Sequence, residues 1–304
     1  MKSVIFTILF TVSGIAYSQQ VADSTYVPPI LMPEYAVGEG SVVFIDEGHH
    51  NFHTKDGRYK AFATLLERDG YLVKPYQGSF SEDKLNKGRI LVVSNALNEK
   101  NVENWFVPTY SAFSDAEIEI VEQWVKEGGS LFLIADHMPM GGAAKKLAAA
   151  FDFEFTDGFA MERKHDGKRG YFSRKNKDLK ENIITNGRNE NERVQEVTSF
   201  TGQAFNIPAN ANPILLLDEK YTNKLPDTAW VFTEKTTTHP ITGWSQGAYA
   251  NYGKGRIVFF GEAAMFTAQL GGKGARKFGM NREEARENYQ LLLNIIHWLD
   301  GKIE

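Results

Sequence analysis

Apolar stretches of strand length alternate with helical patterns along the first half of the chain. Strands are predicted at 41–45, 71–76, 89–94 and 130–135, and helices at 57–70, 114–129 and 142–151. Such alternation is typical of a parallel sheet covered by helices on both faces. Near the end of the chain, a hairpin is predicted at 247–262, and a final helix at 283–301 carries one apolar stripe of helical period.

The helix predicted at 114–129 has clear signals at both ends. Ser114 is followed three residues later by Glu117, which is the pattern of a capping box. Gly128 and Gly129 stand where a helix usually ends on a left-handed residue. The boundaries of this helix are therefore predicted from local chemistry alone.

Two segments depart from the regular alternation. Residues 19–40, which contain Pro28, Pro29 and Pro33, are predicted to form an extended lead-in. Residues of about 152–240 are less regular and are interpreted as an insertion or an antiparallel extension of the same sheet. The chain from 41 to 304 is thus expected to form a single domain with one insertion.

The first 18 residues have the pattern of a cleaved signal peptide. Lys2 precedes an apolar run at 4–15, and Ala16 and Ser18 have the spacing of a small-residue cleavage site. The run is shorter than the roughly 20 residues that span a membrane, and no later segment resembles it. We expect an exported protein, periplasmic or secreted, without a membrane span.

Composition narrows the possible functions. The chain has no cysteine, which excludes disulfides, thiolate metal ligands and a cysteine nucleophile. Its formal net charge is −4, and no basic patch favours nucleic acid as a partner. A small-molecule or saccharide ligand is the expected partner.

Polar residues gather directly after the predicted strands, where open α/β sheets bind their ligands. They are Asp46, Glu47, His49, His50, Asn51 and His53 after the first strand, Asn95 after the third, Asp136 and His137 after the fourth, and Glu262 after the hairpin. Four of the seven histidines lie in two of these loops. The carboxyl edge of the sheet is therefore the predicted site.

One interpretation of this site is a divalent metal centre. His49, His53 and Asp46 supply imidazole and carboxylate groups, a ligand set that suits zinc. The four-residue spacing of the two histidines precedes the predicted helix, so it does not match the helical two-histidine motif of metalloproteases.

A second interpretation is acid–base catalysis without a metal, and a third is binding without catalysis. In the second, His137 or His49 acts as the base, Asp136 orients His137, and Glu262 serves as an acid.

In the third, the polar side chains hold a saccharide or peptide without transforming it. Under either of these interpretations, the residues expected to contact the ligand are Glu47, His50, Asn51 and Asn95.

Several segments together resemble the class I glutamine amidotransferase-like superfamily. They are SVVFIDEGHH (41–50), RILVVSNALN (89–98) and FSDAEIEIVEQWVKEGGSLFLIADH (113–137). The likeness is to branches without amidotransferase activity, which include ThuA-like proteins of sugar metabolism and the sheet domain of gliding-motility and intraflagellar-transport proteins. GEAAMF (261–266) and GMNREEARENYQLLLNIIHWL (279–299) also resemble the ending of a family of exported bacterial proteins of unknown function.

The resemblance implies a flavodoxin-like three-layer α/β/α sandwich with a mostly parallel sheet and an inserted segment. It does not imply glutaminase activity, because the chain lacks the cysteine nucleophile of true amidotransferases. The expected function is that of an exported hydrolase-like enzyme, with or without a metal, acting on a saccharide or another small polar substrate. A non-catalytic ligand-binding or scaffold domain is the alternative.

Overall fold

The computed structural model describes residues 20–163, 170–272 and 274–304. The signal peptide predicted at 1–18 lies outside these residues. Among the residues described, no helix is both long and apolar enough to cross a membrane.

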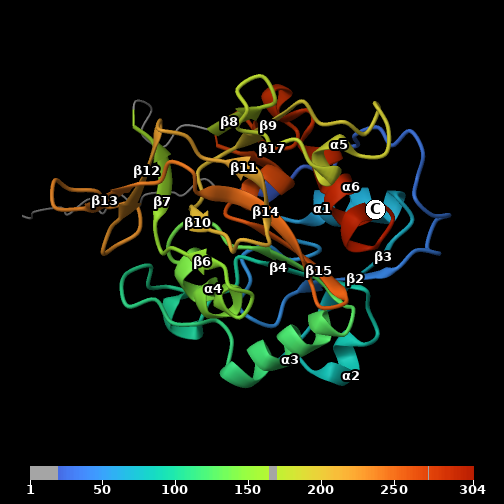
Figure 1. Ribbon diagram of the computed structural model, residues 1–304, viewed down its shortest axis with the longest axis horizontal. Coiled ribbons are helices and arrows are strands. Elements are labelled where there is room, and N and C mark those ends of the chain that lie inside the picture. The colour runs from blue at the N-terminus through green and yellow to red at the C-terminus, as the bar shows by residue number, and fades with distance from the viewer. Residues whose placement is uncertain (1–19, 164–169, 273) are drawn as a thin grey trace, which may run out of the picture.

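One large sheet forms the centre of the fold (Figure 1). Its parallel strands are, in spatial order, β3 (Leu72–Tyr76), β2 (Val42–Asp46), β4 (Ile90–Ser94), β5 (Ser130–Ile134) and β15 (Gly255–Phe260). The sheet continues with antiparallel pairing through β14 (Ser245–Tyr252), β10 (Phe205–Asn206) and β6 (Glu154–Phe155), and β11 (Asn212–Leu216) also pairs with β14. If these five parallel strands are numbered 1 to 5 by their order in the chain, they lie side by side in the sheet in the order 2-1-3-4-5. This is the strand order of flavodoxin-like folds.

Two apolar clusters pack on opposite faces of this sheet. Side chains alternate along a strand, so Val43 and Ile45 of β2 join one cluster and Phe44 joins the other.

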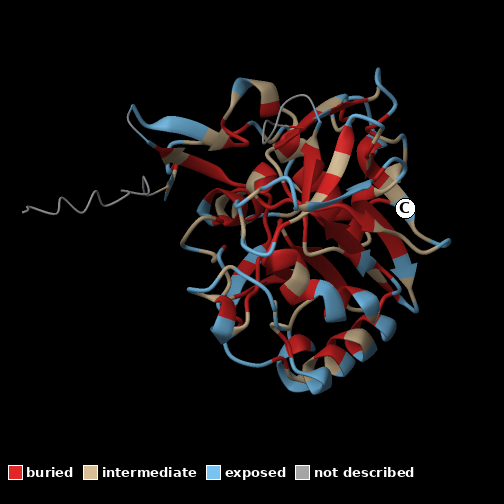
Figure 2. Cartoon of the chain, turned by 90° about the vertical axis from the view of Figure 1, so that its left-hand side faces the viewer, coloured by how far each residue is buried: buried red, intermediate tan, exposed pale blue. Residues whose placement is uncertain are grey.

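The helices are α1 (Lys60–Arg68), α2 (Glu82–Leu85), α3 (Asp115–Lys126), α4 (Met140–Ala149), α5 (Ile183–Asn186) and α6 (Asn288–Leu299), with short 3₁₀ turns η1 (Glu99–Asn101), η2 (Ala264–Phe266) and η3 (Glu283–Ala285). Figure 2 shows the central strands buried and the outer helices exposed on their solvent side.

The local signals at the predicted helix and hairpin are confirmed. Ser114 and Glu117 form a complete capping box at the start of α3, and Gly128 adopts a φ of 129° just after its end. Gly253, with a φ of 57°, turns the chain between β14 and β15. The final helix differs from the prediction, because η3 and α6 replace one continuous helix over 283–301.

The segment 152–240 does more than extend the main sheet. It contributes β6, β10 and β11 to that sheet, and it builds smaller antiparallel sheets from β7 (Phe159–Glu162), β12 (Tyr221–Leu225) and β13 (Thr237–Pro240), and from β8 (Gly170–Ser173) and β9 (Glu196–Ser199). The lead-in contributes β1 (Val21–Ala22), which pairs with β16 (Ala268–Gly271) and through it with β17 (Arg276–Gly279). The protein is a mixed α/β fold with one large sheet and several antiparallel ones.

Candidate functional site

A cavity of about 500 Å³ lies at the carboxyl ends of β4, β5 and β15. Five of the residues predicted from the sequence line it: His53, Asn95, Asp136, His137 and Glu262. They come from four different loops, and each loop directly follows a strand of the main sheet. We call this cavity the pocket.

The ring of His137 is held in one orientation and one tautomer. Its Nδ1 lies 2.8 Å from the carbonyl oxygen of Met138, which can only accept, so Nδ1 carries the proton. The ring stacks on Phe159 at 4.4 Å and meets Trp230 edge-on at 4.6 Å. In the neutral imidazole, Nε2 therefore keeps its lone pair, and no side chain among the described residues donates to it.

Asp136 lies beside this ring without orienting it, contrary to the role expected from the sequence. Its Oδ1 accepts a hydrogen bond from the backbone N–H of His137 and is 3.9 Å from the ring Nε2, too far for a hydrogen bond. Asn95 supports the loop, because its Oδ1 accepts the backbone N–H of Asp136 at 2.9 Å. Asp136 is thus placed to stabilise a positive charge on His137 across a short gap.

Glu262 is buried at the edge of the pocket, with 1% of its surface exposed. Its two oxygens accept backbone N–H groups of Ala264 and Met265 at 2.7 and 2.8 Å. Burial and the nearby charge of Asp136 nevertheless raise the pKa of the Glu262 carboxyl well above its ordinary value. The protonated form of Glu262 is therefore favoured.

His53 is a neutral, buried member of the pocket. Burial, with a smaller contribution from the charge of Arg58, lowers the pKa of His53 to about 3. Its Nδ1 has no hydrogen-bond partner among the residues that the structure describes. The ring lies 4.6 Å from that of Tyr59.

The sequence did not identify several other walls of the pocket. Aromatic and basic side chains complete it: Phe52, Arg58, Trp105, Trp230, Phe278 and Arg282. Trp105 lies in the segment after the third predicted strand, and this position was the available signal for it. Trp230 comes from the irregular insertion, and no local pattern marks it. Arg58 follows the histidine-rich loop, so its place just before α1 was the available signal.

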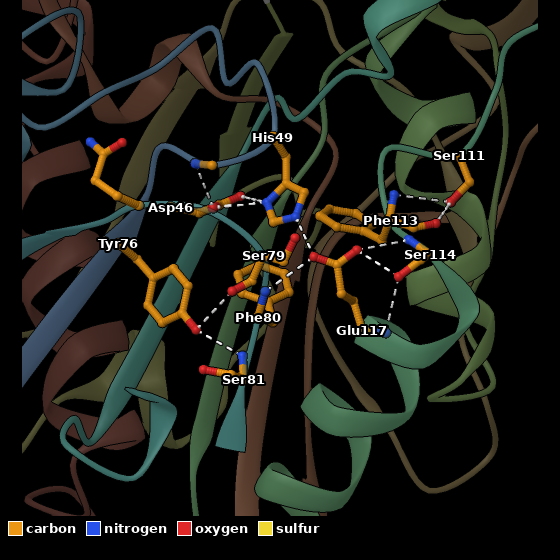
Figure 3. A network of polar contacts seen from close by, with 12 residues as sticks. Asp46, His49, Tyr76, Ser79, Phe80, Ser81, Ser111, Phe113, Ser114 and Glu117 are labelled. Carbon is orange, nitrogen blue, oxygen red and sulfur yellow. Dashed lines mark hydrogen bonds and ion pairs between the residues drawn. The ribbon is translucent and has the colours of Figure 1, made fainter. Parts of the chain in front are cut away.

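Two of the remaining predicted residues, Asp46 and His49, lie in a separate site, which we call the clamp (Figure 3). It consists of Asp46, His49 and Glu117. His49 donates from Nδ1 to both oxygens of Asp46 at 2.9 Å, and from Nε2 to Oε1 of Glu117 at 3.0 Å. Glu117 also accepts from the backbone of Phe80 and from Ser114, so the clamp joins the loop after β2 to the start of α3.

The electrostatics of the clamp favour an imidazolium between two carboxylates. Burial by itself would lower the pKa of His49, but hydrogen bonds and charges from Asp46 and Glu117 outweigh it and raise this pKa. Burial by itself would raise the pKa of Glu117, but the hydrogen bonds from His49 and Ser114 lower it to about 2. His49 has neither ring nitrogen left for catalysis, and it does not line the pocket.

The other residues predicted to bind a ligand have structural partners or face solvent. Asn51 donates to Asp46 and to the carbonyl of Ser94, and its Oδ1 accepts from the backbone of His49. Glu47 accepts from the backbone of Lys55 and from Gln77. His50 is exposed, with a φ of 49°. None of these three lines the pocket.

The metal ligand set proposed from the sequence is not assembled. His49 and Asp46 bind each other in the clamp, whereas His53 lies in the pocket. Within the described part of the chain, no group of three or more His, Asp or Glu side chains is arranged to hold a metal ion. The cause is Glu117, which occupies the second nitrogen of His49.

No family model matches this sequence, and no curated protein matches it significantly. Solved structures do resemble it. The N-terminal domain of mmIFT52 has a TM-score of 0.57 and 13% identity, over 85% of this chain and 97% of that one. The cytoplasmic protein STM1381 from Salmonella typhimurium LT2 has a TM-score of 0.50 and 13% identity, over 85% and 98%. A putative ThuA-like protein from Bacteroides uniformis ATCC 8492 has a TM-score of 0.48 and 12% identity, over 91% and 96%.

The first two of these likenesses show the fold and nothing finer. The sheet domain of intraflagellar-transport proteins is one of the groups that the sequence resembles, and the mmIFT52 domain has the same fold as this chain over most of both lengths. The resemblance found in the sequence is therefore confirmed at the level of the fold, while the chemistry has to be argued from the pocket.

Proposed function

We propose that this protein is an exported hydrolase, built on a flavodoxin-like three-layer α/β/α scaffold, that cleaves a saccharide or another small polar substrate in the pocket. The observation that carries the proposal is the state of His137. A fixed tautomer with a free Nε2 lone pair, beside a carboxylate and inside a cavity, is the arrangement of a general base.

The pocket residues supply complementary proton transfers. Nε2 of His137 takes a proton from the attacking water, and the imidazolium that forms is stabilised by Asp136. The protonated carboxyl of Glu262 donates a proton to the leaving group. Hydrolysis of this kind uses a base that accepts a proton from water and an acid that protonates the leaving group. No step depends on a metal, because the residues gathered here do not form a metal centre.

The aromatic walls support a saccharide as the substrate. Trp105 and Trp230 line the cavity beside His137, with their ring centres 6.4 and 4.6 Å from that of the imidazole. Aromatic faces combined with a few polar groups suit the alternating apolar and hydroxylated faces of a sugar. The resemblance to ThuA-like proteins of sugar metabolism supports the same class.

The test is hydrolysis of a panel of 4-nitrophenyl glycosides and esters by the wild-type protein and by His137→Asn. Asparagine can still donate to the carbonyl of Met138 but has no basic nitrogen, so we expect a loss of about 10²- to 10⁴-fold in kcat with the fold retained. Equal kcat in both proteins would contradict the assignment.

Export is tested by amino-terminal sequencing of the secreted protein. We expect the mature chain to begin close to Gln19.

The alternative is a non-catalytic binding domain, and one observation favours it. Both oxygens of Glu262 accept backbone N–H groups, so this side chain also caps the loop that leads to η2. Under this alternative, calorimetry detects saccharide binding to the wild-type protein, and none of the panel is hydrolysed. Turnover that depends on His137 excludes it.

A further inference from the structure

Arg58 is a half-buried cation without a counterion in the part of the chain that the structure describes. It lines the pocket, and its Nη1 donates to the neutral Oε1 of Gln20 at 3.2 Å. No carboxylate among the described residues lies within ion-pair distance of it. Arg282, in the same pocket, is paired with Glu284 at 2.8 Å. Partial burial of a charge is costly unless an opposite charge compensates it, so Arg58 is suited to an anion from outside.

A row of aromatic rings connects Arg58 to the proposed base. The guanidinium carbon of Arg58 lies 4.0 Å from the ring centre of Phe52. Phe52 is 5.9 Å from Trp105, and Trp105 is 6.4 Å from His137. Phe52 and Trp105 therefore link Arg58 to His137 through successive ring contacts.

The groups near Arg58 favour a singly charged anion. His53 lies beside it and is neutral, because burial and Arg58 itself lower the pKa of this histidine to about 3. The carboxylate of Asp136 also lines the pocket and opposes a large negative charge on the ligand. One guanidinium balances one carboxylate in a bidentate pair, whereas a phosphate dianion would remain half-compensated.

We propose that the ligand of this pocket is an acidic saccharide, such as a uronic acid glycoside, whose carboxylate binds Arg58. Its sugar ring packs along Phe52 and Trp105, and the bond to be cleaved lies at His137. The assignment deepens the proposed hydrolase function and rests on it only for the position of the cleaved bond.

The experiment compares the binding of two probes that differ in a single group. 4-Nitrophenyl β-D-glucuronide and 4-nitrophenyl β-D-glucoside differ only at C6, which is a carboxylate in the first and a hydroxymethyl group in the second, and calorimetry measures the Kd of each. We expect the glucuronide to bind the wild-type protein about tenfold more tightly, since a charge-assisted bidentate pair contributes at least that much. Arg58→Gln should remove this preference.

Arg282→Gln is the matched control, because it removes the same charge from the same pocket but from an arginine that already has a carboxylate partner. It should keep the preference for the glucuronide. Equal affinity for both probes in the wild-type protein, no binding of either probe, or a preference that survives Arg58→Gln would each overturn the proposal. Tighter binding of glucose 6-phosphate than of glucuronate would also overturn it, in favour of a phosphate ligand.

The same measurements separate this proposal from the hydrolase function. His137→Asn should bind the glucuronide with the wild-type preference, since His137 and Arg58 lie at opposite ends of the aromatic row. A preference for the acidic probe without turnover would contradict the hydrolase function and support the acidic ligand. Turnover of neutral substrates with no preference for the acidic probe would support the hydrolase function and contradict the acidic ligand.

Discussion

The clamp and the pocket use the same residue types at the same edge of the sheet, and they differ in how many partners each histidine has. In the clamp, His49 uses both ring nitrogens on carboxylates. In the pocket, His137 uses Nδ1 alone, and the Nδ1 of His53 is unpaired within the described chain. Saturated polar groups stabilise a fold, whereas groups with free lone pairs remain available to a ligand.

The two regions also differ in the direction of their pKa shifts. The clamp raises the pKa of His49 and lowers that of Glu117, so both groups are favoured in their charged forms. The pocket lowers the pKa of His53 and raises that of Glu262, so both are favoured in their neutral forms. Paired charges are typical of structural ion networks, and neutral buried acids and bases are typical of reactive sites.

The largest effect on stability is expected from His49→Ala. The substitution leaves Asp46, which is fully buried, facing Glu117 without the imidazolium between them. Breaking a buried pair in this way costs about 3–5 kcal/mol, so the free energy of unfolding in urea should fall by that amount.

The matched control for this prediction is His50→Asn, the exposed neighbour in the same loop. Asparagine tolerates the positive φ at this position, so we expect a change within about 0.5 kcal/mol. If His49→Ala were no more destabilising than His50→Asn, the clamp would not be the structural unit that its geometry suggests.

A smaller effect is expected from pH, measured as the difference in unfolding free energy between the wild-type protein and His49→Gln. The pKa of His49 is raised in the folded state, so its contribution is complete below the ordinary value of 6.5 and is lost as pH rises through the folded pKa. The pKa of Glu117 is lowered to about 2, so its contribution is present above 4.5 and is lost as pH falls toward 2.

The difference between the two proteins should therefore be greatest between about pH 4.5 and pH 6.5 and should decline on both sides. A difference that stays constant from pH 3 to pH 9 would show that His49 acts by packing against Phe80 and Phe113, and that its charge contributes nothing.

The smallest effect is expected in the pocket, from Asp136→Asn. Burial would still raise the pKa of Glu262, but the repulsion from a neighbouring carboxylate would be removed, so this pKa should fall. Carbon-13 NMR of labelled glutamate carboxyl groups measures the change. Asp115→Asn, on the exposed surface of α3, should leave the titration of Glu262 as it was.

Local chemistry was sufficient to predict much of the fold. The strands after Gly40, the capping box of Ser114 and Glu117, and the turn at Gly253 depend on residues close together in the chain, and all are confirmed. The sequence also identified the strand-end loops, since the carboxyl ends of parallel strands lie at one edge of a sheet.

The distant residues that each polar or aromatic side chain contacts could not be predicted in the same way. Glu117 was identified as a helix cap, but its bond to His49 joins residues 68 positions apart. Because of this contact, His49 and Asp46 belong to the clamp and do not form the predicted metal site with His53. Similarly, Trp230 reaches His137 from an insertion without a recognisable pattern.

The sequence by itself determined the strand and helix pattern, the absence of cysteine chemistry, and the polar loops in which a site would form. Only the tertiary structure decided which histidines are saturated by carboxylates and which face a cavity with their nitrogens free. The physical reason is that helix caps and turns depend on nearby residues, whereas hydrogen-bond partners and burial depend on which distant segments the fold brings together.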